Sequence, residues 1–378
     1  MRANLAWLAV PAAALAIVVT LLLIWRPLDL VSNSSPPVEE VTVESVALTP
    51  GLIRMFLRTD GSRPVAIAQV QVDGAYRLFS ADPPAPSSRL GALRLDIPYP
   101  WISGEAHHIA LVTATGLVIN HEIEVAQETP GLNAASLRLL GTVGLLLGVV
   151  PVVIGLLAWP AMRSVSPQGL SFILALTIGL LGFLLVDTIG EGLENAGETI
   201  GRLRGPALFW AVFAVTTIAL LALGRRHGHA PEGLKLSLFI AIGIGLHNFG
   251  EGLAVGAALS SGAAALAAYL VIGFTIHNVT EGIGIAAPLA KEKPALAQFA
   301  ALAAIAGLPA VAGTVIGTQA ISPLWVSVCF AIGAGAILQV IIEIVALIQR
   351  RTGVTITPAT AAGVTSGFAI MYGTALFV

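Results

Sequence analysis

A six-residue polar phrase occurs twice in the apolar C-terminal part of this chain, starting first at His247 and again at His277. The first copy reads His-Asn-Phe-Gly-Glu-Gly and the second His-Asn-Val-Thr-Glu-Gly. Each lies in a glycine-rich apolar run long enough to cross a bilayer as a helix. Residues i and i+4 share one face of a helix, so His247 pairs with Glu251 and His277 with Glu281. Ionisable groups at that depth are costly and mark ion or substrate paths, which restricts the chain to a membrane bundle with a polar interior.

The distance between the copies corresponds to one membrane crossing and a short turn, which predicts an antiparallel helical hairpin. Its two His–Glu pairs would converge on one divalent metal site. Imidazole and carboxylate ligands suit Zn²⁺, with Fe²⁺, Mn²⁺, Co²⁺ or Cd²⁺ as alternatives, and the lack of thiolates disfavours Cu⁺. Asn248 and Asn278 would add an oxygen or orient a glutamate. Two ordinary core histidines are the competing reading, which the repetition disfavours.

The doubled HN-x-x-EG phrase resembles the fourth and fifth transmembrane helices of the ZIP (Zrt/Irt-like) metal transporters. The likeness in helix count and order covers residues 135–378 and is sharpest over 240–290. It implies gradient-driven, alternating-access transport of a divalent metal ion into the cytoplasm by a homodimer. The metal residues expected from spacing and resemblance together are His247, Asn248, Glu251, His277, Asn278 and Glu281.

The chain departs from the ZIP pattern in two places. Gly250 and Thr280 stand where family members usually have proline. Leu308-Pro309 stands where many members carry Glu-Pro, whose glutamate completes a second metal position. One metal ion per chain is therefore expected, with L308E restoring the second position.

Four further polar residues of the predicted spans are candidates for an ion pathway. Asp187 and Glu191 repeat the central spacing with Asp in place of His, and form either an acidic mouth or a solvated helix end. Gln339 and Glu343 lie one turn apart in the seventh span, and either bond a neighbouring helix or take part in transport.

The rest of the C-terminal part fits a polytopic membrane protein. Hydrophobic residues are 56% of the chain and charged residues only 11%, well below the share in soluble domains. The spans must be helical, because lipid offers backbone groups no hydrogen-bond partner. Eight are expected near 137–158, 170–190, 206–223, 235–258, 264–289, 296–317, 324–348 and 357–377.

The distribution of Lys and Arg predicts the orientation. It places the connectors 159–169, 224–234, 290–295 and 349–356 in the cytoplasm. Residues 31–130 and the C-terminus then lie outside a cell (inner) membrane. Residues 1–30 are expected to form an uncleaved transmembrane anchor, with a cleaved signal peptide as the alternative.

Residues 31–130 contain short alternating runs separated by turn residues such as Asp73-Gly74, which predicts a small β-sandwich resembling an immunoglobulin or fibronectin module. All strong ligands lie after residue 240, so this domain is expected to fold alone and to be unnecessary for metal passage. Its histidines, His107, His108 and His121, are expected to be ordinary strand or turn residues rather than a metal-capture site.

The sequence argues against several classes of function and leaves one alternative to transport. A net charge of −2 argues against a nucleic-acid partner, and the single cysteine, Cys329, forms no intrachain disulfide. No HExxH, serine-nucleophile or P-loop motif is present, so an enzyme or ATP-driven pump is not expected. Transport of a divalent metal ion, with the metal and the lipid bilayer as partners, is the leading reading. A membrane metal sensor or receptor without transport is the alternative.

Overall fold

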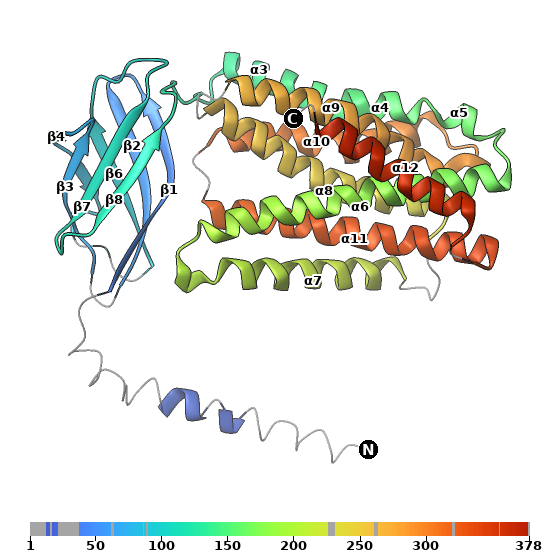
Figure 1. Ribbon diagram of the computed structural model, residues 1–378, viewed down its shortest axis with the longest axis horizontal. Helices are drawn as coiled ribbons and strands as arrows, with labels where there is room; N and C mark the ends of the chain where they lie inside the picture. Colours follow the sequence, from blue (N-terminus) through green and yellow to red (C-terminus); the bar gives the residue numbers. More distant parts are fainter. Residues whose placement is uncertain are drawn as a thin grey trace.

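The computed structural model describes residues 13–15, 17–21, 38–61, 64–85, 87, 90–225, 231–260, 264–319, 322–354 and 356–376, without the side chains of 264–266. A β domain comes first and a long helical bundle follows, with the β domain beside one end of the bundle (Figure 1). The expected anchor over 1–30 falls largely outside the described residues, of which 13–15 and 17–21 are helical.

The β domain consists of two antiparallel sheets, with strand orders β1-β2-β6-β5 and β4-β3-β7-β8. Alternate residues of both sheets point inward, and Met55 and Leu95 of one share a core with Val70 and Leu111 of the other. The expected sandwich of two sheets is therefore present. Its strands are β1 (Glu39–Thr49), β2 (Leu52–Gly61), β3 (Ile67–Val72), β4 (Ala75–Arg77), β5 (Ser80–Asp82), β6 (Gly91–Pro98), β7 (His107–Thr113) and β8 (Val118–Ile123).

The predicted turn at Asp73-Gly74 joins β3 to β4. Both residues have positive φ, 55° and 76°, as a two-residue hairpin turn of this hand requires. The Asp73 carboxylate accepts hydrogen bonds from the Tyr99 hydroxyl, the His108 amide and a His107 ring nitrogen. Asp73 thus ties this hairpin to β7.

Within the described residues, seven helices are long and apolar enough to cross a membrane. Those spans are Ala134–Met162, Pro167–Gly197, Gly201–Gly224, Gly233–Ser260, Ala267–Lys291, Leu296–Gly317 and Pro323–Thr352. The first combines α3 (Ala134–Gly144), the π-helical segment η1 (Leu145–Val149), α4 (Val150–Leu156) and α5 (Trp159–Met162). The others contain α6 (Pro167–Gly197), the 3₁₀ turn η2 (Gly201–Leu203), α7 (Gly205–Gly224), α8 (Gly233–Ser260), α9 (Ala264–Ala286), the 3₁₀ turn η3 (Ala287–Lys291), α10 (Leu296–Gly317) and α11 (Pro323–Thr352).

The eighth expected span, 357–377, forms a helix but is not one of these seven. It is α12 (Pro358–Ala375), which has 18 residues and is rich in Ala, Gly and Thr. Those residue types make it less apolar than the other spans. It packs against α6, where Gly179 and Gly367 bring the two backbones together.

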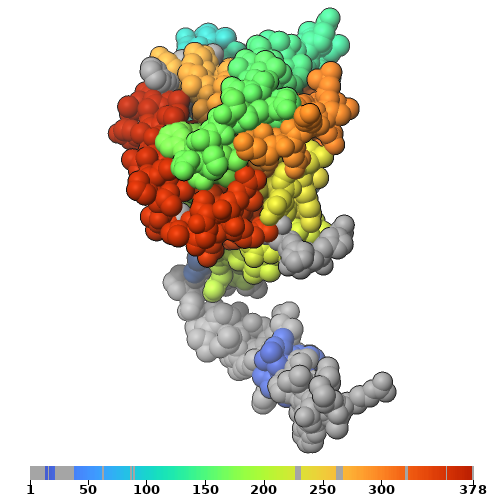
Figure 2. Space-filling view, turned by 90° about the vertical axis from the view of Figure 1, so that its right-hand side faces the viewer, coloured from blue at the N-terminus to red at the C-terminus, as the bar shows by residue number. Residues whose placement is uncertain are grey.

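The helices alternate in direction, so every second connector lies at the end of the bundle beside the sandwich (Figure 1). The other end holds the connectors with most of the basic residues, among them Arg163, Lys291 and Arg350, and the helix ends there form a closely packed surface (Figure 2). The relative placement of the connectors therefore agrees with the expected topology. Which end faces the cytoplasm stays a prediction from the positive charges.

Glycines let helices α8 and α10 pack backbone to backbone. A Cβ on Gly252 would lie 2.3 Å from the carbonyl oxygen of Ala310, and one on Gly313 would lie 2.2 Å from that of Phe249. Small residues at helix contacts are the usual means of close approach within a membrane. This packing explains the glycine-rich composition of the doubled phrase. It also holds α10 against α8 at Phe249 and Gly252, within two turns after His247.

Candidate metal centre

Three side chains from the doubled phrase meet inside the bundle. His247 and Glu251 extend from α8 and His277 from α9, and one ligand atom from each lies within 4.8 Å of the other two. All three residues are buried, with exposed fractions of 4%, 2% and 7%. Among the described residues no other group of three or more His, Cys, Asp or Glu side chains is placed in this way. The hairpin predicted from sequence therefore brings three of its four His and Glu side chains to one point.

Glu251 is the centre of this group. Its Oε1 atom lies 3.0 Å from His247 Nε2 and also bonds His277 Nε2, while Oε2 accepts a hydrogen bond from Asn278 Nδ2 at 3.1 Å. The ring nitrogens of both histidines thus point at one carboxylate. Imidazole nitrogens and a carboxylate oxygen converging at this spacing are a ligand set for a first-row divalent ion.

Thr188 of α6 fixes the orientation of the His247 ring. Its hydroxyl donates to the Leu184 carbonyl at 2.7 Å, so the same oxygen is left to accept from His247 Nδ1 at 3.0 Å. The Nδ1–H tautomer leaves a lone pair on Nε2, facing the Glu251 carboxylate. Two acceptors that face each other need a proton or a metal ion between them, and a hydrogen-bonded Nδ1 is the arrangement found in metal-bound histidines.

Several buried oxygens around this group accept no hydrogen bond from the described part of the chain. They are Asn248 Oδ1, Asn278 Oδ1 and both carboxylate oxygens of Glu281. The amide nitrogens of the two asparagines, in contrast, donate to backbone carbonyls, those of Ala306 and Leu147 at 3.1 and 3.0 Å. Buried acceptors without a protein donor are costly unless a water molecule or a cation satisfies them. The side chains present therefore fit a bound metal ion.

The π-helical segment η1 supplies one of these backbone carbonyls. A π turn breaks the regular i to i−4 pattern and is often found at functional sites. The Leu147 carbonyl, within η1, accepts the bond from Asn278, which links the first span to the hairpin. η1 thus helps to orient the asparagine of the second phrase.

Glu281 is buried, with 4% exposure, but it is not one of the three converging residues. It lies within electrostatic reach of Glu251. The sequence predicted four equivalent ligands. In the structure three of these side chains meet, and the carboxylate of Glu281 lies beside them.

The structure places the four pathway candidates in two different regions. Asp187 lies within electrostatic reach of His247, His277 and Glu251, and Glu191 lines a cavity one turn further along α6. Glu343, in contrast, is fully buried in α11 in a bidentate pair with Arg225, with nitrogen–oxygen distances of 2.8 and 3.2 Å. Gln339, one turn before it, is also buried. Of the two readings for Glu343, this geometry supports bonding to a neighbouring helix.

Leu308 does not lie where the ZIP resemblance placed it. Its side chain is 50% exposed, whereas its neighbours on α10 reach inward: the Ala306 carbonyl bonds Asn248, and Pro309 packs toward Gly245. A side chain at an exposed position of α10 does not face the buried centre. The expectation that L308E restores a second metal position therefore lacks its structural basis.

The histidines of the sandwich have ordinary partners or surroundings. His107 Nδ1 hydrogen-bonds the Asp73 carboxylate, and His108 Nδ1 lies 3.8 Å from Glu122 Oε1. Burial lowers the pKa of His121, which favours its neutral form. None of the three belongs to a group of three or more ligand side chains within the described residues, and that they are ordinary strand or turn residues stays a prediction.

No protein-family model matches this chain, and a comparison with curated proteins finds no similar sequence. The case for a function therefore depends on the residues and their geometry. Sequence reasoning missed two parts of the centre, Thr188 and the carbonyls of Leu147 and Ala306. Residues 187–192, Asp-Thr-Ile-Gly-Glu-Gly, repeat the phrase imperfectly, and Thr188 occupies the position of the asparagines. That match could have indicated Thr188 from sequence.

Proposed function

We propose that this protein transports divalent transition-metal ions, zinc foremost, across a membrane through the centre formed by His247, Glu251 and His277. One observation carries the proposal. Three metal-ligand side chains meet, buried, within a bundle of seven candidate membrane spans, and the buried oxygens around them accept no hydrogen bond from the described residues. A membrane interior tolerates such a group where it serves an ion path.

The chemistry of the site favours a borderline divalent ion. Two imidazoles with carboxylate and amide oxygens suit Zn²⁺, and also Fe²⁺, Mn²⁺, Co²⁺ or Cd²⁺. Glu251, with Glu281 beside it, offsets the charge of a dication, which lowers the cost of burying it. The ZIP-like phrase supports import toward the cytoplasm. We propose a homodimer as the assembly and α12 as the eighth membrane span.

The strand order of the sandwich supports an immunoglobulin-like architecture for the β domain. Lettered in chain order, β1-β2-β6-β5 corresponds to A-B-E-D, and β4-β3-β7-β8 corresponds to C-F-G with an added edge strand. We place this domain on the extracytoplasmic side, since the basic residues gather at the opposite end of the bundle.

A membrane metal sensor is the second candidate, because it would use the same binding group without moving the ion. The described residues outside the bundle form the sandwich, short connectors and the helical residues 13–15 and 17–21, and the sandwich offers a surface for a signalling partner.

Uptake by purified protein in vesicles that contain a zinc-sensitive dye separates these functions. The unmodified protein should carry Zn²⁺ inward and bind it, whereas E251A should do neither, since it removes the carboxylate that both histidines face. E122A, at an exposed position of the sandwich, should behave as the unmodified protein. Binding without uptake would indicate the sensor, and undiminished binding by E251A would contradict both candidates.

A further inference from the structure

The sandwich is attached to the bundle at the connector between α6 and α7. Arg202 of η2 forms an ion pair with Asp60 of β2, whose exposed fraction is 6%. One residue earlier, the Gly201 amide donates to a carboxylate oxygen of Glu40 on β1, at 2.7 Å. We call these two contacts the clamp. Two neighbouring strands are thereby held against one short turn of the bundle.

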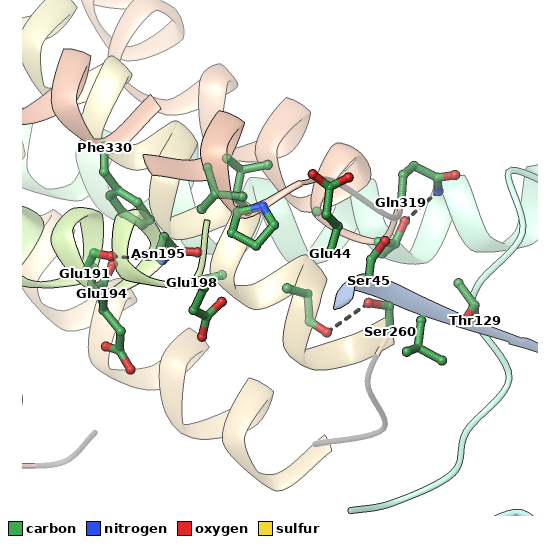
Figure 3. A pocket seen from close by; sticks show the side chains of 18 residues that line it. Glu44, Ser45, Thr129, Glu191, Glu194, Asn195, Glu198, Ser260, Gln319 and Phe330 are labelled. Carbon is green, nitrogen blue, oxygen red and sulfur yellow. Dashed lines mark hydrogen bonds between the residues drawn. The ribbon is translucent and has the colours of Figure 1, made fainter. Parts of the chain in front are cut away.

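A cavity of about 390 Å³ lies between the sandwich and the bundle. Its lining includes Glu44, four residues after Glu40 of the clamp, and Glu198, three residues before Gly201. One wall is β1, at Glu44, Ser45 and Val46, and the segment after the sandwich adds Thr129. The other walls are the ends of α6, α8, α10 and α11. Figure 3 shows Glu44 and Ser45 on one side and glutamates of α6 on the other. Removing the sandwich would therefore remove a wall of this cavity.

Acidic residues run from the cavity toward the metal centre along one face of α6. Glu198, Glu194 and Glu191 line the cavity, spaced by three or four residues and so on one helix face. Asp187 continues this face by one turn and lies within electrostatic reach of His247, His277 and Glu251. At the inner end, Phe330 lines the cavity and packs against Gly250, next to Glu251.

Charge distinguishes the two walls. The Glu44 carboxylate is paired with Arg58, at 2.9 and 3.2 Å, so the sandwich wall is close to neutral. The described side chains of Glu191, Glu194 and Glu198 form no ion pair with a basic residue. A cleft lined by one sign of charge, with a low-dielectric wall opposite, focuses the field on an incoming ion.

We propose that the β-sandwich is a fixed wall of the entrance to the metal centre. The clamp holds β1 opposite the acidic face of α6, and divalent cations pass through the cavity between the two domains. This inference rests on the proposed function for the identity of the ion. It reverses the expectation that the domain is unnecessary for metal passage: the domain contributes no ligand, but it confines and focuses the path to the ligands.

Opening the clamp should slow the arrival of metal and leave the centre intact. R202D places a second carboxylate against Asp60 and should repel the sandwich. We expect uptake at low Zn²⁺ concentration, and the rate of Zn²⁺ binding followed by stopped-flow, to fall roughly tenfold, the lower range of steering effects in charged clefts. Binding stoichiometry at the centre should not change.

The controls use the same connector. R204D makes the same charge change two residues away, at a residue that forms no ion pair within the described structure, and should leave uptake unchanged. R202K keeps the positive charge and should recover most of the uptake. Equal rates in R202D and R204D would overturn the proposal.

A second variant tests the route without disturbing the clamp. In a C329A background, A257C introduces a thiol into the cavity wall, and a bulky thiol reagent should block both uptake and the rate of metal binding. S80C, at an exposed position on β5 away from the cavity, should be labelled without effect. Full activity of labelled A257C would overturn the route.

These measurements separate the two proposals. Unmodified protein that binds Zn²⁺ but carries none into vesicles would contradict transport. In that case the binding rates of R202D, R204D and labelled A257C would still decide whether the cavity is the entrance.

Discussion

At the residue scale, the centre is defined by which atoms lack hydrogen-bond donors. His247 has its Nδ1 atom on Thr188 and its Nε2 atom toward Glu251. The asparagines give their nitrogens to backbone carbonyls, and Asn278 also to Glu251, while their oxygens accept no hydrogen bond from the described residues. These oxygens are therefore available to a bound cation.

Replacing Thr188 by valine tests this arrangement. T188V keeps the shape of the side chain but removes the acceptor for His247 Nδ1, and we expect Zn²⁺ affinity to fall about 10- to 100-fold, the usual effect of losing a partner that orients a ligand. Isothermal titration of the purified protein measures it.

The matched control is T177V. Thr177 lies on the same helix and is equally buried, but within the described part of the chain its hydroxyl bonds the Ile173 carbonyl alone. Equal affinities of T188V and T177V would show that Thr188 does not orient the ligand.

At the scale of elements, the last residue of each phrase is a packing residue. Gly252 contacts α10, and Gly282 contacts α4, where a Cβ would lie 2.3 Å from the Val152 carbonyl oxygen. The ligand helices are therefore held by backbone contacts on the faces next to the ligands. Movement of α4 or α10 would displace the centre.

Substituting Gly252 by alanine should separate α8 from α10. The new Cβ has no room beside the Ala310 backbone, and overpacking of this kind costs about 1–3 kcal/mol. We expect a lower unfolding temperature and weaker metal binding. Thermal unfolding, with and without Zn²⁺, measures both.

G190A provides the comparison. A Cβ at Gly190 of α6 meets no atom within 4 Å, and alanine favours a helix over glycine by about 1 kcal/mol, so G190A should be neutral or stabilising. A G252A protein as stable as G190A would contradict the packing argument.

At the scale of the whole molecule, two units with separate cores meet at one connector. The sandwich buries Ile53, Leu57, Val72 and Ile109 in its own core, while the bundle core is built from its helices alone. Residues 31–130 are therefore expected to fold without the bundle. Their position in the full chain is set by the Asp60–Arg202 and Glu40–Gly201 contacts.

The free energy of unfolding of the isolated sandwich should decrease at low pH, because Asp73 becomes protonated there. Burial raises the pKa of this carboxyl, but three hydrogen bonds outweigh that effect and leave the pKa below its ordinary value of 3.8. A lowered folded pKa stabilises the fold above the unfolded value, and this contribution is lost as the pH falls through the folded pKa.

D73N lacks this contribution. At pH 7 it should be less stable than the unmodified domain by about 1.5–3 kcal/mol, the range for hydrogen bonds to a charged group. The difference should shrink as the pH falls below 3.8. Urea unfolding at both pH values measures it, and a constant difference would exclude the ionised carboxylate as the cause.

The sequence by itself determined the features that follow from local spacing. The i and i+4 pairs placed His247 with Glu251, apolar runs fixed the spans from α3 to α11, and Asp73-Gly74 predicted its hairpin turn. These depend on helix period, bilayer thickness and the φ preferences of single residues, all of which act within a few turns of chain.

Only the tertiary structure decided which groups share a space. It brought His277, but not Glu281, to the Glu251 carboxylate, paired Glu343 with Arg225, and left Leu308 on an exposed face. It also placed β1 across the acidic face of α6. Such choices depend on helix rotation and on the approach of backbones at glycine contacts, where a shift of one residue turns a side chain by about 100°. No local pattern encodes that rotation, because the packing of neighbouring helices sets it.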